Sequence, residues 1–184
     1  MTANVETGRG RGSPWRLVGW GIAATLILLP LVAMQFTSEV DWTLADFIFA
    51  IVMIGTVGLL FELAVRMTSN WANRAGAACA LAAAFLLVWI NGAVGMIGSE
   101  GNPNNLLFGL VLLVALIGAI AGRFRANAMS LAMAAAGLAY VLLVPIVVML
   151  TAGPVETREI TLTLLFAGPW FLSAALFRKA ARSA

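Results

Sequence analysis

Six stretches of apolar residues follow one another along the chain, separated by short polar segments. They cover residues 17–36, 46–65, 76–98, 103–122, 127–150 and 160–177. Each is close to or above the roughly 20 residues with which an α-helix crosses about 30 Å of hydrocarbon. The ten-residue alternation of a transmembrane β-strand does not occur in them. The pattern therefore predicts an all-α, polytopic membrane protein built as a six-transmembrane-helix bundle.

The segments between these stretches are too short to hold a soluble domain. Residues 1–15 are rich in Gly, Arg, Ser and Pro, a composition typical of a disordered tail. We therefore expect a disordered N-terminal tail over residues 1–15, a single transmembrane domain over residues 16–179, and a short tail over residues 180–184.

Composition supports a membrane location and narrows the possible chemistry. Apolar residues make up 62% of the chain and charged residues 10%, whereas soluble domains average about 45–50% and about 25%. The 184 residues include no His, one Cys (Cys79) and one Lys (Lys179). Histidine-ligated haem or zinc, serine–histidine catalysis and an intramembrane retinal Schiff base are thereby excluded. We expect no enzymatic activity, no cofactor and no metal.

The basic residues predict the orientation of the chain. Ten of the eleven fall on one side of the predicted membrane, and only Arg158 falls on the other. The ten are Arg9, Arg11, Arg16, Arg66, Arg74, Arg123, Arg125, Arg178, Lys179 and Arg182. Because Lys and Arg in short loops mark the cytoplasmic side, both chain ends are predicted to be cytoplasmic. These side chains lie along helix ends, which favours anionic lipid headgroups at the cytoplasmic face as partners and argues against nucleic acid.

A carboxylate and a guanidinium are predicted to meet at the inner end of the second stretch. Glu62 precedes Arg66 by four residues, the spacing and order of a favourable helical ion pair. The expected role is an ion pair at the inner rim, with Arg74 across the turn as a second possible partner for Glu62. A proton-carrying role for Glu62 is the alternative, because carboxylates inside membranes are often functional.

The outer half of the third stretch combines an amide with several glycines. Asn91, Gly92 and Gly95 predict one wall of an outward-facing polar pocket, with Asp46 and Glu100 at its mouth. Two alternatives remain open. Asn91 also suits an interhelical hydrogen bond, and glycines also suit close helix packing that leaves no space.

The acidic residues near the outer rim also suit helix capping. Asp41 is expected to cap a helix that starts at Trp42, and Asn102 followed by Pro103 forms a favourable start for the next helix. Tyr140, in the fifth stretch, is expected to bond its hydroxyl group within the bundle.

Small residues predict tight packing toward the inner side. Gly118 and Gly122 form a GxxxG motif at the end of the fourth stretch, and residues 76–84 and 128–139 are rich in alanine. Small side chains let helix backbones approach closely.

The segment WINGAVGMIGSEGNPNN, at residues 89–105, resembles a group of small uncharacterised bacterial multi-span membrane proteins. The resemblance extends over about residues 29–125. The resemblance implies a protein of the bacterial inner membrane. It implies no particular activity, and it identifies no functional residues in this chain.

Three functions are compatible with these features. The one we favour is a structural or accessory membrane subunit that binds a membrane-protein partner, or a second copy of itself, through its helices. The alternative is a small-solute or ion permease or channel subunit that uses the outward-facing polar pocket. A lipid- or quinone-modifying enzyme is the weakest, because its acid–base chemistry would depend on carboxylates at the rims.

Overall fold

The part of the chain that the structure describes consists of helices joined by short loops, with no strand. This computed structural model describes residues 14–93, 95–97, 99, 101–151 and 157–183. The helices are α1 (Pro14–Ala33), α2 (Leu44–Met67), α3 (Trp71–Ala93), the 3-10 helix η1 (Pro103–Phe108), α4 (Gly109–Ala121), α5 (Ala126–Thr151) and α6 (Thr157–Arg182). The all-α prediction is confirmed, and five helical stretches, α1, α2, α3, η1 with α4, and α5, are long and apolar enough to cross a membrane.

The chain forms two compact units, residues 1–58 and 59–184, with the boundary inside α2. The first unit contains α1 and the beginning of α2. Among its described residues, α1 buries only Pro30, and over its whole length α2 buries only Ala50. Large apolar side chains such as Leu17 and Leu44 are more than 70% exposed. Helices that are apolar on all sides are typical of lipid surroundings.

Helix α2 begins with a capping box. The Thr43 N–H and hydroxyl both donate to Asp46 Oδ2 at 2.7 Å, and the Asp46 N–H donates back to Thr43 Oγ1 at 3.4 Å. This reciprocal pairing satisfies amide groups that a helix start leaves without partners. The prediction that Asp41 caps a helix from Trp42 is therefore wrong, because Thr43 supplies the cap.

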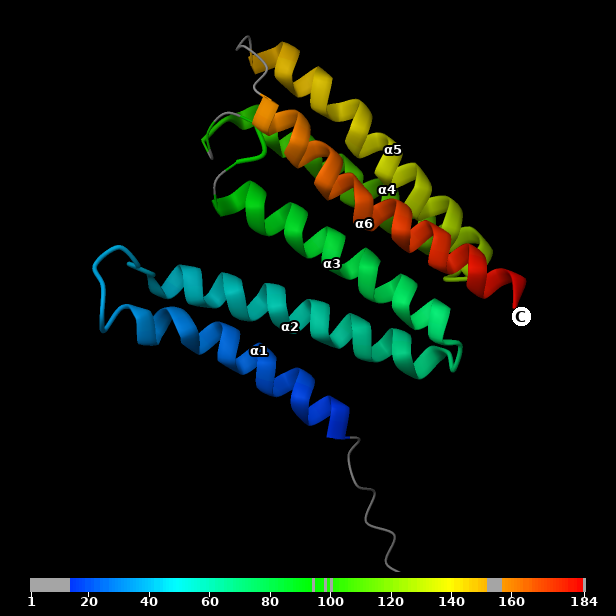
Figure 1. The fold of residues 1–184 in the computed structure, drawn as a ribbon, viewed down its shortest axis with the longest axis horizontal. Coiled ribbons are helices and arrows are strands. Elements are labelled where there is room, and N and C mark those ends of the chain that lie inside the picture. Colours follow the sequence, from blue (N-terminus) through cyan, green and yellow to red (C-terminus); the bar gives the residue numbers. More distant parts are fainter. Residues whose placement is uncertain (1–13, 94, 98, 100, 152–156, 184) are drawn as a thin grey trace, which may run out of the picture. The chain divides into compact units, whose positions relative to one another are not determined.

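The second unit is a layered arrangement of four long helices. Helix α6 lies between α3 and α5, and α4 packs on α5 (Figure 1). Its core contains large side chains that are almost completely buried, with Tyr140, Phe108 and Trp170 the largest. The tilted rings of Phe108 and Tyr140 lie 5.6 Å apart, which joins η1 to α5.

Glycine allows α4 and α5 to approach closely. A Cβ atom added at Gly118 would lie 2.5 Å from Ala132 Cβ, and one added at Gly122 would lie 2.3 Å from Ala128 Cβ. Both distances are too short for two carbon atoms, so only glycine fits at these two positions. The GxxxG motif therefore forms the tight contact that the sequence predicts.

Two helix boundaries differ from the predicted stretches. Helix α3 ends at Ala93 rather than at residue 98, and the Gly95 N–H donates to Ile90 O at 3.1 Å beyond its end. Gly95 has φ +75°, a conformation that suits glycine and stops the helix. The next helix begins as predicted, with Asn102 as its cap and Pro103 in its first turn, but its first six residues form the 3-10 helix η1.

The turn between α4 and α5 is a Schellman motif. The Arg123 N–H donates to Ile120 O at 2.9 Å, and the Phe124 N–H donates to Ala119 O at 3.0 Å. Arg123 has φ 50° and Phe124 has φ 57°. Glycine usually occupies the left-handed position of this motif, so this chain places two L-residues in a conformation that they rarely adopt.

Candidate functional site

A network of asparagine side chains organises the segment between α3 and α4. Asn105 is only 3% exposed. Its Oδ1 accepts from the Ile97 N–H at 3.1 Å, and its Nδ2 donates to Ile97 O at 3.2 Å and to Ser99 O at 2.9 Å. One side-chain amide therefore binds three backbone groups of a segment that has no regular secondary structure of its own. This satisfies polar groups that would otherwise be costly to bury.

Asn91 connects α3 to this network. It lies in the last turn of α3, and its Nδ2 donates to Asn105 O at 2.9 Å. This contact is the tertiary hydrogen bond considered as one role for Asn91. Its Oδ1 is buried and has no hydrogen-bond partner among the described residues. That oxygen can accept a hydrogen bond from a hydroxyl or N–H donor.

The structure describes three of the other four residues of the predicted outer pocket, Gly92, Gly95 and Asp46. Gly92 is exposed, and a Cβ atom added there meets nothing within 4 Å. By contrast, a Cβ atom added at Gly95 would lie 2.5 Å from Ser99 O and 2.8 Å from Asn105 Nδ2. The space beside Gly95 is thus filled by its own loop. Asp46 belongs to the other unit, where it closes the α2 capping box, and Glu100 lies outside the described residues.

The surroundings of the Tyr140 hydroxyl group differ from the prediction. Its side chain is completely buried among the core residues, and within the described chain its hydroxyl group has no hydrogen-bond partner. The expected hydrogen bond of this hydroxyl is therefore not formed with any residue that the structure describes. The aromatic ring, which packs against Phe108, accounts for the residue's place in the core.

The opposite end of the second unit carries the predicted ion pair. The Arg66 guanidinium donates to the Glu62 carboxylate four residues earlier in α2. Arg74 bonds to the backbone instead, with its Nε donating to Thr68 O at 2.8 Å and an Nη donating to Val65 O at 3.2 Å. Arg74 therefore holds the turn between α2 and α3.

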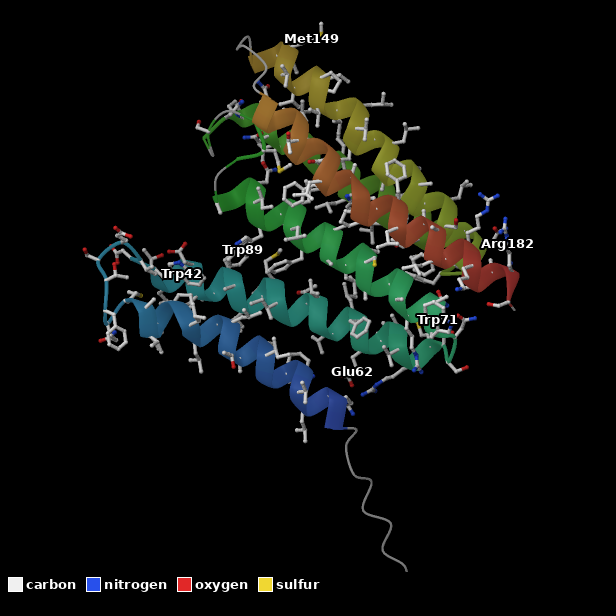
Figure 2. The ribbon with its side chains drawn as sticks, viewed as in Figure 1. Trp42, Glu62, Trp71, Trp89, Met149 and Arg182 are labelled. Carbon is white, nitrogen blue, oxygen red and sulfur yellow. The ribbon has the colours of Figure 1, made fainter. Side chains whose placement is uncertain are left out.

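The end of α6 is attached at this same end of the unit. Asn70 Nδ2 donates to Ser183 Oγ at 3.0 Å, and Lys179 Nζ lies 4.6 Å from the centre of the Trp71 ring. Farther along, the buried Ser173 hydroxyl donates to Gly76 O at 2.8 Å, which joins α6 to α3. Figure 2 shows Trp71 and Arg182 toward this end of the four-helix unit and Met149 at the other.

Sequence reasoning did not single out Asn105 or Ser173, which make the most deeply buried polar contacts described. The asparagine-rich segment 102–105 inside an apolar region was an available signal for Asn105, whereas serine in an apolar helix is too common to mark Ser173. The described residues contain no cluster of three or more His, Cys, Asp or Glu side chains placed to hold a metal ion.

These contacts define two polar regions in the second unit, the asparagine network at the α3–η1 end and the basic end near Arg66 and Arg182. Comparison with protein-family models, with curated proteins and with solved structures gave no match to this chain, so its function is inferred from its own residues.

Proposed function

We propose that this chain is a multi-pass protein of the bacterial inner membrane with six spans. Helix α6 is the sixth span in this proposal, because it is 26 residues long and packs along α3 and α5, which are themselves long and apolar enough to cross. A helix that packs between two membrane-spanning helices and has their length lies in the lipid bilayer with them.

Both chain ends lie on the cytoplasmic side in this proposal. The support is the distribution of charge, since Arg66 and Arg182 lie in the last turns of α2 and α6, and Arg125 immediately precedes α5. Reporters fused after Ala184 test this. A reporter active only in the cytoplasm is expected, and activity only in the periplasm would refute the orientation.

We infer that the protein acts as a structural or accessory subunit that binds a membrane-protein partner through its helices, and that it is not an enzyme. The observation that carries this is the surface of α1 and α2, which expose apolar side chains on all sides and each bury one described residue. The middle stretches of the helices contain no charged residue, so the midplane offers no group for charge-coupled transport.

Gly21 on α1 offers a place where a partner helix can approach. A Cβ atom added at Gly21 meets nothing within 4 Å. Small residues on apolar helices are typical of helix–helix contacts in membranes. A second copy of the chain is the simplest alternative to a different partner.

Isolation of the full chain from membranes in a mild detergent tests the subunit function. A partner at a fixed stoichiometry is expected to copurify, and Gly21→Leu is expected to weaken that association. Gly109→Leu is the matched control, since its position in α4 is equally open. Isolation of the chain without a partner and as a monomer would contradict the proposal.

A small-solute permease is the second candidate, and the unpartnered Asn91 Oδ1 is the observation that favours it. A solute with a hydroxyl or N–H donor would bind this oxygen from the outer side. Solute flux in proteoliposomes that is lost in the Asn91→Leu variant would support this function.

Cysteine labelling tests whether this region is open to the outer side. Single cysteines at positions 91 and 92 in a Cys79→Ala background are expected to react with an impermeant thiol reagent added outside only if the region is open. Position 95 is unsuitable for labelling, because an added side chain there would collide with Ser99 O.

A further inference from the structure

The α4–α5 turn and the last turns of α6 lie at the same level of the second unit. The Ser130 hydroxyl on α5 donates to Ala174 O on α6 at 2.8 Å. Arg125 lies five residues before Ser130, and Arg178 lies four residues after Ala174. At 1.5 Å per residue, both positions are about 6–8 Å beyond that hydrogen bond along the antiparallel helices. The turn and the end of α6 therefore form one basic surface.

Several of the other basic side chains at this end already have partners. Arg66 pairs with Glu62, Arg74 bonds to backbone carbonyls, and Lys179 lies over the Trp71 ring. These contacts fix the helix ends in place. They do not involve the arginines of the α4–α5 turn or of the last turns of α6.

Four exposed arginines make up the surface that remains. Arg123 and Arg125 come from the turn, and Arg178 and Arg182 come from α6. Within the described part of the chain, none of the four pairs with a carboxylate. A concentration of positive charge without acidic neighbours favours an anionic ligand.

Phe124 indicates which kind of anion suits this surface. It lies between Arg123 and Arg125 and is 51% exposed. It also lies in the left-handed Schellman turn, where a glycine would be the favourable residue. An aromatic side chain between arginines suits the boundary between lipid headgroups and acyl chains. A free phosphate or a nucleic acid backbone would not use an exposed phenylalanine next to apolar helix ends.

We propose that the surface formed by Arg123, Phe124 and Arg125 of the turn and Arg178 and Arg182 of α6 binds the headgroup of an anionic phospholipid. The arginines bind the phosphodiester, and Phe124 contacts the upper acyl chains. This proposal rests on the membrane location given above and assigns the lipid contact to a particular surface rather than to the whole basic side.

Native mass spectrometry of the detergent-solubilised full chain tests the assignment. The protein is titrated with phosphatidylglycerol or with the zwitterionic phosphatidylcholine in mixed micelles, and the retained lipids are counted. Phosphatidylglycerol is expected to be retained and phosphatidylcholine to be lost. Inorganic phosphate at millimolar concentration is expected not to displace the retained lipid.

Paired variants locate the binding surface. Arg123→Gln with Arg125→Gln is expected to weaken retention about 25-fold, because each basic side chain near an anionic surface contributes about fivefold. Arg178→Gln with Arg182→Gln is expected to have a similar effect. Arg9→Gln with Arg11→Gln removes the same charge from the N-terminal segment, and this control is expected to retain lipid like the unaltered chain. The thermal midpoint of each variant without added lipid checks that it is folded.

Three results would overturn the proposal. They are equal loss of lipid in the N-terminal control, displacement by inorganic phosphate, or equal retention of the two lipids. Lipid retention in detergent depends neither on membrane orientation nor on a protein partner. The reporter fusion and the copurification experiment therefore fail or succeed separately from it.

Discussion

Replacement of Gly118 by alanine tests the close contact between α4 and α5. The added Cβ atom would lie 2.5 Å from Ala132 Cβ and 3.2 Å from Ala132 Cα. Carbon atoms pack best about 3.5–4.0 Å apart, so the two helices must separate by roughly 1 Å. Neither colliding atom is the end of a flexible side chain, and rotamer changes cannot relieve the overlap.

The size of the effect follows from two opposing contributions. Overpacking of a well-fitted contact costs about 1–3 kcal/mol, whereas alanine is favoured over glycine within a helix by about 1 kcal/mol. Gly109→Ala in the same helix isolates the second contribution, because nothing lies within 4 Å of its added Cβ atom. We expect Gly118→Ala to be less stable than Gly109→Ala by about 1–3 kcal/mol.

The assay is equilibrium unfolding in mixed micelles, followed by the helical circular dichroism signal. A double-mutant cycle completes it, in which Ala132→Gly is combined with Gly118→Ala. Removing the opposing methyl group should restore about 1–2 kcal/mol of the loss beyond the sum of the single changes. Equal stability of the two glycine variants, or strict additivity in the cycle, would refute the close approach of these helices.

Three further substitutions test single contacts, all by the same unfolding measurement. Tyr140→Phe should stabilise the protein by about 1 kcal/mol, because it removes a buried hydroxyl group without a partner; destabilisation would show that the hydroxyl is bonded after all. Asn105→Ala should cost about 2–4 kcal/mol, because three backbone groups lose the same amide partner, and a loss below 1 kcal/mol would contradict the network. Arg123→Gly should stabilise the protein by about 1 kcal/mol by relieving the left-handed conformation, whereas Arg125→Gly, outside that conformation, should not.

Long-range features of the fold followed from the sequence because they depend on composition over many residues. Apolar stretches of about 20 residues have few alternatives to a membrane helix, and the Gly118–Gly122 spacing predicted a tight contact. The Glu62–Arg66 pair depends only on helical spacing, and the structure contains it.

The local features that sequence reasoning missed depend on how separate segments meet. The sequence predicts Gly95 as one more residue of the helix, whereas in the structure its φ is +75° and it lies close to Asn105. The predicted outer site grouped Asp46 with Asn91 because both were assigned to the outer side. In the structure the Asp46 carboxylate is used by the Thr43 capping box, and the Asn91 amide binds η1. Hydrogen bonds of this kind are set by neighbours that are distant in sequence.

The central position of α6 has a consequence for biosynthesis. Helix α3 packs against α6 and is held to it by the Ser173–Gly76 hydrogen bond, yet α4 and α5 are made between the two. At roughly 5–20 residues per second, the synthesis of α3 is complete several seconds before α6 has been made. The α4–α5 hairpin closes on itself in the meantime. We therefore expect α3 to lack its α6 contact, and to be accessible to chaperones, until α6 has been made.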